Sequence, residues 1–188
     1  TEFNVELVKR YDGVGPRYTS YPTAPQFSPQ FDGKEFINAI KDSNQDPIPR
    51  ALSLYAHIPF CFSPCFYCGC NRIITRDEAK KQAYLEHLLK EIELIAPYFD
   101  SDREVVQLHL GGGTPNSLNT GQLEQLVRKF SESFRFAPEN EREFSIEIDP
   151  RTVSTGDVAA LRAMGFNRVS LGIQDFDADV QQAINRHQ

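Results

Sequence analysis

The spacing of apolar residues along the chain changes near residue 50. Residues 1–50 show little periodicity apart from a short amphipathic stretch at 33–42, so we expect a mostly irregular lead-in segment there. Beyond it, stretches of alternating apolar and polar residues take turns with stretches whose apolar residues recur three and four positions apart. This pattern predicts strands at 51–60, 104–110, 143–149 and 167–176 and helices at 79–99, 120–134, 155–165 and 177–186.

Four strand–helix units in series predict a parallel sheet, either an open doubly wound sheet or a barrel. Parallel strands covered on both faces are usually apolar throughout. These strands instead have one apolar and one polar face, as where Ile146 and Ile148 oppose Glu147. Helices on the apolar face and a polar interior favour a barrel. We therefore expect an α/β fold, a partial (β/α) barrel of about four βα units, with residues 1–50 as the lead-in and 51–188 as the first part of the barrel domain.

Composition and charge exclude several classes of function. The 188-residue chain carries a net charge of −6, which does not favour a nucleic-acid surface. No apolar run approaches the ~18 residues of a membrane span, and the first residues do not resemble a signal peptide, so we expect a soluble cytoplasmic protein. Because the chain starts at Thr1 and stops directly after the last predicted helix, we also expect it to be the N-terminal part of a longer protein.

All four cysteines lie in one stretch, CFSPCFYCGC at 61–70, directly after the first predicted strand. Their spacing is Cys61-x3-Cys65-x2-Cys68, with Cys70 two residues further on. Disulfides between such near neighbours close very small loops with poor geometry. Thiolates also bind zinc, but a structural zinc site usually has four ligands in two separated pairs. Three closely spaced thiolates favour an iron–sulfur cluster, and a zinc-binding module without a catalytic role remains the alternative.

Several motifs resemble one enzyme family. The cysteine spacing after the first strand and GGGTP at 111–115 after the second are similar to motifs of the radical S-adenosylmethionine (SAM) superfamily. Within it, the chain resembles the oxygen-independent coproporphyrinogen III oxidases in PRYTSYPTA at 16–24, LYAHIPFC at 54–61, IEIDPR at 146–151 and LGIQDF at 171–176. Haem chaperones built on the same scaffold are the alternative. The PRYTSYPTA lead-in and the Cys68-x-Cys70 ending favour the oxidases.

The resemblance implies two cofactors and a set of residues that bind them. It implies that Cys61, Cys65 and Cys68 ligate a [4Fe-4S] cluster and that Cys70 is not a ligand. Two SAM molecules are implied, the first on the open iron and in contact with the catalytic candidates Tyr55 and Glu147 and with Gly112. Contacts to the second are implied for Tyr67, Gly113, Thr114, Gln174 and Arg186. His57 and His109 are interpreted as hydrogen-bonding residues, and Arg17 is a hypothetical contact of the substrate propionates.

The reaction implied by the resemblance is oxidative decarboxylation. Two propionate groups of coproporphyrinogen III become vinyl groups, giving protoporphyrinogen IX in anaerobic haem biosynthesis. The radical that abstracts a substrate hydrogen comes from reductive cleavage of SAM, so the reaction also needs an external electron donor and an electron acceptor. We expect the full-length protein to be a monomer and the 188-residue chain alone to be inactive.

Overall fold

A computed structural model describes residues 4–13, 26–48 and 50–188 of the chain. The motif at 16–24, including Arg17, lies outside the described residues. The chain divides into two compact units, Thr1–Asn38 and Ala39–Gln188, each described by itself here. Within the described ranges, no helix combines the length and the apolar character that crossing a bilayer requires.

The described residues of the lead-in segment include two helices. Helix α2 (Gly33–Asn44) covers the predicted amphipathic stretch. Helix α1 (Val5–Tyr11) was not expected from the sequence, because seven residues are too few to show a clear apolar period. Its N-terminus is capped by Asn4, whose side-chain oxygen accepts a hydrogen bond from the Leu7 amide at 2.9 Å. The prediction of irregular structure was therefore wrong for this part of the lead-in.

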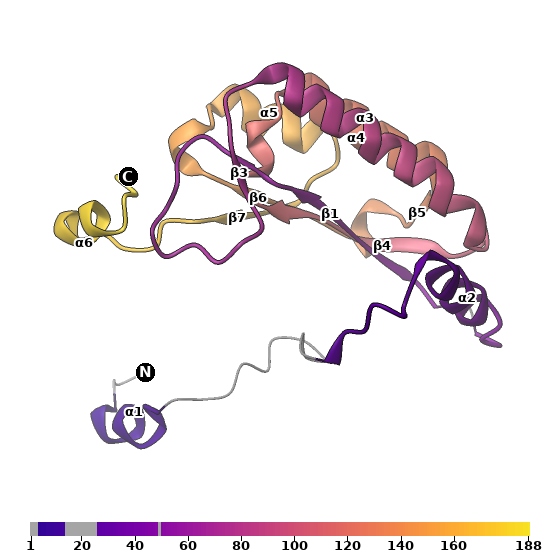
Figure 1. Cartoon of the computed structure of the whole chain (residues 1–188), viewed down its shortest axis with the longest axis horizontal. Coiled ribbons are helices and arrows are strands. Elements are labelled where there is room, and N and C mark those ends of the chain that lie inside the picture. Colours follow the sequence, from indigo (N-terminus) through magenta and orange to yellow (C-terminus); the bar gives the residue numbers. More distant parts are fainter. Residues whose placement is uncertain (1–3, 14–25, 49) are drawn as a thin grey trace. The chain divides into compact units, whose positions relative to one another are not determined.

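The second unit is built on a parallel sheet with strand order β1-β4-β6-β7. Its strands are β1 (Leu52–Ile58), β4 (Glu104–Gly112), β6 (Glu143–Ile148) and β7 (Arg168–Leu171), and the short β5 (Arg135–Phe136) pairs with the start of β4. Helices α3 (Glu78–Ile95), α4 (Thr120–Ser133) and α5 (Thr155–Ala163) cover one face of the sheet (Figure 1). Because the strand order follows the chain order and these helices share a face, the arrangement is that of a partial (β/α) barrel, as predicted.

The hydrophobic core lies between this sheet and the three helices. Its buried members include Leu85 and Ile92 of α3, Leu123, Leu126 and Phe130 of α4, Leu161 of α5, and Ala56, Leu108, Leu110, Phe144 and Ile146 of the strands. An irregularity in the pairing of β1 with β4 changes which valine of β4 belongs to this core. The register shifts between Leu52, opposite Val105, and Ser53, opposite Gln107, so that Val106 is an extra residue in its strand. Val105 is consequently fully buried, whereas alternation along the strand predicts Val106, in line with Leu108 and Leu110, on the apolar face.

The edge strand β7 departs from the predicted pattern. Val169 and Leu171 alternate with polar residues, which predicts that they pack against helices, yet they are 48% and 50% exposed. Helix α6 (Ala178–Ala183), which follows β7, lies beyond the end of the sheet and does not cover its face (Figure 1). Asp177 caps this helix, accepting hydrogen bonds from the Asp179 and Val180 amides. The position of α6 brings its C-terminal end to the loops at the carboxyl edge of the sheet.

Candidate cofactor site

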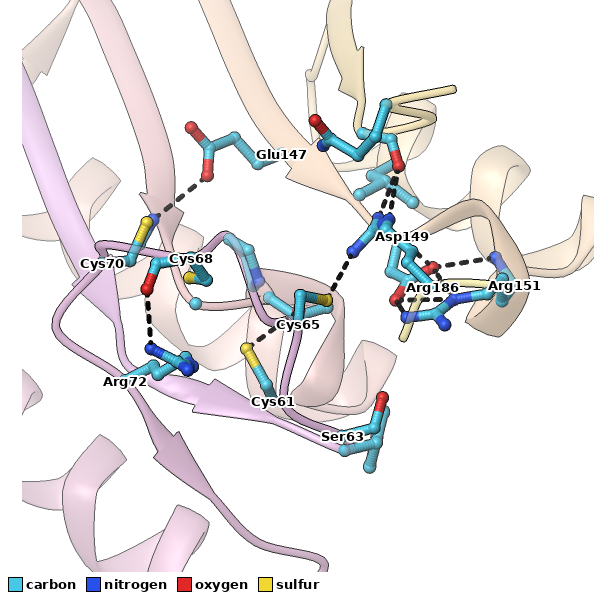
Figure 2. A pocket seen from close by; sticks show the side chains of 18 of the residues that line it. Cys61, Ser63, Cys65, Cys68, Cys70, Arg72, Glu147, Asp149, Arg151 and Arg186 are labelled. Carbon is cyan, nitrogen blue, oxygen red and sulfur yellow. Dashed lines mark hydrogen bonds and ion pairs between the residues drawn. The ribbon is translucent and has the colours of Figure 1, made fainter. Parts of the chain in front are cut away.

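A cavity of about 350 Å³ opens at the carboxyl ends of the parallel strands. Four segments line it, at or just after the ends of the four main strands: residues 61–72, 112–115, 147–151 and 170–174, together with Arg186 (Figure 2). All the predicted site residues line this cavity except Tyr55. The carboxyl edge of a parallel sheet is where (β/α) folds place their active sites, so the location fits the polar-face argument from the sequence.

The cysteine loop is closed at its base by two short parallel strands. Strand β2 (Phe60–Cys61) pairs with β3 (Ile73–Ile74). The Ile73 amide donates to the Pro59 carbonyl at 2.7 Å, and the Thr75 amide donates to the Cys61 carbonyl at 3.0 Å. This ladder joins the two ends of the loop and holds Cys61 beside residues 73–75.

The thiols differ in their surroundings. Cys65 is buried, Cys61 and Cys68 are half-buried, and Cys70 is exposed. Burial raises the pKa of Cys61. A hydrogen bond with the Thr114 hydroxyl lowers this pKa in part, and the negative charges that Cys68 and Cys65 carry as thiolates raise it further. The Cys61 sulfur and the Thr114 oxygen lie 3.3 Å apart. Since a thiol binds iron only as the thiolate, loading of this site must release protons.

The donor set fits an iron–sulfur cluster. In the part of the chain that the structure describes, no three His, Cys, Asp or Glu side chains meet closely enough to hold one metal ion. The three predicted ligands instead line the cavity together with the glycine motif. An iron–sulfur cluster contains several irons, and each thiolate binds its own iron, so its ligands surround a volume and not a point. The thiol chemistry and the size of the cavity agree with that requirement.

The glycine motif approaches the cysteine loop through its backbone. The Gly113 amide donates to the Ile58 carbonyl at 2.8 Å, and a Cβ at Gly113 would lie only 2.8 Å from the Pro59 carbonyl. Gly112 has φ = +117°, and a Cβ there would lie 2.7 Å from the His57 ring. Side chains are excluded at both positions, because the end of β4 packs directly on the segment that leads into the cysteine loop.

Glu147 projects from the polar face of β6 toward the glycine motif (Figure 2). Its Oε2 accepts a hydrogen bond from the Gly112 amide at 3.2 Å, and its Oε1 lies 3.5 Å from His109 Nε2. The carboxylate is thus oriented by two donors while its side chain stays 44% exposed. It can still accept hydrogen bonds from a cationic ligand in the cavity.

Tyr55 lies outside the cavity wall, on the same polar face. Its ring stacks on His109 with centroids 5.8 Å apart, and its hydroxyl lies 3.0 Å from His57 Nδ1. His57 Nε2 lies 2.8 Å from the Asn71 carbonyl, to which it can only donate. In the neutral ring, Nδ1 then accepts a hydrogen bond from the Tyr55 hydroxyl. Burial, and the nearby charge of Glu147, raise the pKa of Tyr55, so the residue acts as a neutral hydrogen-bonding group.

No role was expected for Asp149 and Arg151 beyond their place in the IEIDPR motif, yet they form an ion pair in the cavity wall (Figure 2). Arg151 Nη2 and Nε donate to the Asp149 carboxylate at 2.6 and 2.9 Å, and Arg186 Nη2 lies 3.7 Å from Asp149 Oδ1. Burial acts to raise the pKa of Asp149, but the hydrogen bonds from Arg151 and the charge of Arg186 outweigh it and lower the pKa. The sequence feature that could have predicted this ion pair is an aspartate and an arginine two residues apart at the end of a predicted strand.

We expect Asp149→Asn to lower the free energy of unfolding at pH 7 by about 2 kcal/mol, the scale of hydrogen bonds to charged groups. A carboxyl whose pKa is lower in the folded protein stabilises the fold above its unfolded pKa of about 4 and loses this contribution as pH falls through the folded pKa. The difference in the free energy of unfolding between the wild type and Asp149→Asn should therefore shrink below pH ~4. Denaturant titrations at pH 7 and pH 3 measure it, and an unchanged difference would contradict the prediction.

Comparison with known proteins identifies the family. The model of the radical SAM superfamily matches residues 55–188, and the chain belongs to this superfamily. A [4Fe-4S] cluster and SAM are the cofactors of that family, and the cavity described above is the part of this chain whose donors suit them.

Within the superfamily, the chain is similar to proteins named oxygen-independent coproporphyrinogen III oxidase. The relative from Pseudomonas aeruginosa is 45% identical over 186 residues, covering 99% of this chain and 40% of that protein. The relative from Synechocystis is 49% identical over 187 residues, covering 100% and 39%. A solved structure of coproporphyrinogen III oxidase from Escherichia coli, described as a radical SAM enzyme, matches with a TM-score of 0.83 at 44% identity, over 100% of this chain and 40% of that one. The chain thus spans about 40% of the length of the proteins it matches.

Proposed function

We propose that the protein containing this chain is an oxygen-independent coproporphyrinogen III oxidase. It would convert two propionate groups of coproporphyrinogen III to vinyl groups and so form protoporphyrinogen IX. One observation carries the proposal: the cysteine loop, the glycine motif and the side chains after β6 and β7 meet at one cavity. They do so in a chain to which eight relatives of that name are 42–49% identical over 92–100% of its length.

In this proposal, Cys61, Cys65 and Cys68 hold the cluster and leave one of its irons free of protein ligands. When bound, the cluster supplies the electron that cleaves SAM to methionine and a 5′-deoxyadenosyl radical. The β2–β3 ladder holds the loop while this happens. Cys65 is the buried member of the proposed ligand set, so this thiol is shielded from bulk water.

The remaining predicted residues divide between two SAM molecules. The backbone of Gly112 and the oriented carboxylate of Glu147 are suited to the first, because SAM carries an ammonium group that a carboxylate can pair with. Tyr55 supports this position from the polar face, through its stacking on His109. The second SAM would lie against the other cavity-lining residues, which are Tyr67, Gly113, Thr114, Gln174 and Arg186.

We expect Glu147→Gln to weaken SAM binding about 10- to 100-fold, the factor that loss of a charge-assisted hydrogen bond produces. The amide keeps the shape of the side chain and can still accept from Gly112, so the change isolates the charge. Glu143→Gln is the matched control, since Glu143 lies on the same strand but pairs with Arg168 at 2.8 Å, outside the cavity. Calorimetric titration of the reconstituted full-length protein with SAM measures both variants. Equal affinities would remove Glu147 from the site.

The function is tested with the full-length protein, reconstituted with iron and sulfide without oxygen, and supplied with coproporphyrinogen III, SAM, a reductant and an electron acceptor. Formation of divinyl product with loss of two CO2 supports the proposal. Haem binding without vinyl product would identify the chaperone function instead. Zinc without acid-labile sulfide would identify the non-catalytic module.

We also propose that a separate electron donor reduces the cluster and that a separate acceptor takes the final electron. The full-length enzyme is proposed to be a cytoplasmic monomer. Equilibrium dialysis with labelled SAM tests the number of SAM molecules, with two per chain expected and one per chain contradicting the second site.

A further inference from the structure

The C-terminal end of α6 contacts the middle of the cysteine loop at consecutive residues. The Phe66 amide donates to the Ile184 carbonyl at 3.0 Å. The side-chain amide of Asn185 donates to the Pro64 carbonyl at 2.7 Å. These are long-range contacts between segments more than a hundred residues apart, and they reach the loop on both sides of Cys65.

The next residue, Arg186, reaches Cys65 itself. Arg186 Nη1 donates to the Cys65 sulfur at 3.5 Å (Figure 2). The guanidinium is anchored from the other side, because its Nε and Nη2 both donate to the Gly172 carbonyl. Both Cys65 and Arg186 are 8% exposed. Residues 184–186, here named the α6 clamp, therefore hold one short stretch of loop by three successive contacts.

The clamp depends on the backbone of Asn185. This residue has φ = +54°, in the left-handed region that asparagine tolerates better than most residues. The left-handed turn ends α6, where the Arg186 amide donates back to the Gln181 carbonyl at 2.8 Å. As a result, the Ile184 carbonyl, the Asn185 side chain and the Arg186 guanidinium all make contacts with the loop.

The start and the middle of the cysteine loop are thus secured differently. Cys61 belongs to the β2–β3 ladder and is fixed by backbone pairing. Among the described residues, the hydrogen bonds that tie the backbone of 64–66 to parts of the fold outside the loop come from the clamp. Loss of the clamp should therefore free the Cys65 segment while leaving the ladder intact.

We propose that Asn185 is a positioning residue, which holds Cys65 in the conformation that binds the cluster. The inference rests on the proposed assignment of Cys65 as a cluster ligand, and it assigns to Asn185 a role in cofactor retention that does not require contact with either SAM. Its left-handed turn and its bond to Pro64 together place the Cys65 segment.

The test uses Asn185→Gly in the full-length protein. Glycine keeps the left-handed turn and removes only the side-chain bond to Pro64. In the cluster-free protein, exchange of the Phe66 amide measured by NMR should become about fivefold faster, the effect of one net hydrogen bond on a local equilibrium. The Thr75 amide, in the ladder, should exchange at the wild-type rate. In the reconstituted protein, a chelator should remove iron about fivefold faster by the same argument.

Two further variants keep the test decisive. Asn185→Asp preserves the shape but places a carboxylate against the Pro64 carbonyl, so it should release iron at least as fast as the glycine variant. Gln188→Ala is the control, because Gln188 bonds to the carbonyls of Gly172 and Ile173 and not to the loop. It should behave as wild type.

Wild-type iron release from Asn185→Gly would overturn the proposal, whatever the amide exchange shows. Equal acceleration of the Phe66 and Thr75 amides would also overturn it, since that result means general destabilisation. Cys65→Ser tests the proposed cluster ligands separately from the role of the α6 clamp. If this variant retains the cluster, the proposed ligand set fails, whereas loss of the cluster together with wild-type release from Asn185→Gly refutes only the clamp.

Discussion

Cys65→Ser is expected to leave the full-length protein without a stable [4Fe-4S] cluster. Serine is nearly isosteric with cysteine, but its hydroxyl stays protonated at neutral pH and its oxygen does not match the preference of the cluster irons for thiolate. Cys65 is also the most buried of the four thiols, so no neighbouring cysteine can take its place without movement of the loop. Iron and acid-labile sulfide per chain, measured after anaerobic reconstitution, should fall close to zero.

Cys70→Ser is the matched control for this experiment. Cys70 lies in the same loop and lines the same cavity, but it is exposed and is not one of the proposed ligands. Its serine variant should keep wild-type iron and sulfide. If Cys70→Ser loses as much iron as Cys65→Ser, then the assignment of Cys61, Cys65 and Cys68 as the complete ligand set is wrong.

The second large effect is expected at Gly113. In Gly113→Ala the new Cβ would lie 2.8 Å from the carbonyl carbon and oxygen of Pro59, which belong to backbone and cannot rotate away. Overpacking of this kind typically costs about 1–3 kcal/mol. Relief of the clash must separate the glycine motif from the segment before Cys61. SAM affinity should therefore fall together with the free energy of unfolding.

Gly156→Ala provides the comparison. Gly156 is in the first turn of α5, and a Cβ there would lie 3.6 Å from the Ser154 hydroxyl, an ordinary contact. Alanine is favoured over glycine within helices by up to about 1 kcal/mol, so this variant should be as stable as wild type or more stable. Denaturant titration and SAM titration of both variants test the pair. Similar behaviour at the two positions would show that the close approach at Gly113 is unimportant.

The repeating order of strands and helices was predictable because its signal is local. Alternation along a strand and three-to-four spacing along a helix depend only on which side of each element faces the core. The shift from Val106 to Val105 in the core was not predictable, because a bulge is a property of two paired strands. The exposure of Val169 and Leu171 depends likewise on where α6 lies, which no local pattern reports.

In the candidate site, too, the features that are local in the sequence were predictable, and those that depend on the complete fold were not. The cysteine spacing and the glycine motif are contiguous in sequence, and their meeting follows from their positions after neighbouring parallel strands. Asp149 and Arg151 also follow a strand, but their pairing and the effect of Arg186 on the Asp149 pKa appear only when the fold is complete. The contact of Asn185 with Pro64 spans 121 residues and depends on the direction in which α6 ends.

The order in which the cavity-lining residues occur along the chain has a consequence for biosynthesis. Its parts occur in chain order: the cysteine loop first, then the glycine motif, then Glu147, and finally Gln174 and Arg186. A ribosome therefore releases the cysteines more than a hundred residues before the α6 clamp that secures them. Since a growing chain folds from its N-terminus as it emerges, the thiols pass through a period without their final support. We expect cluster insertion to become stable only after α6 has been synthesised and has docked.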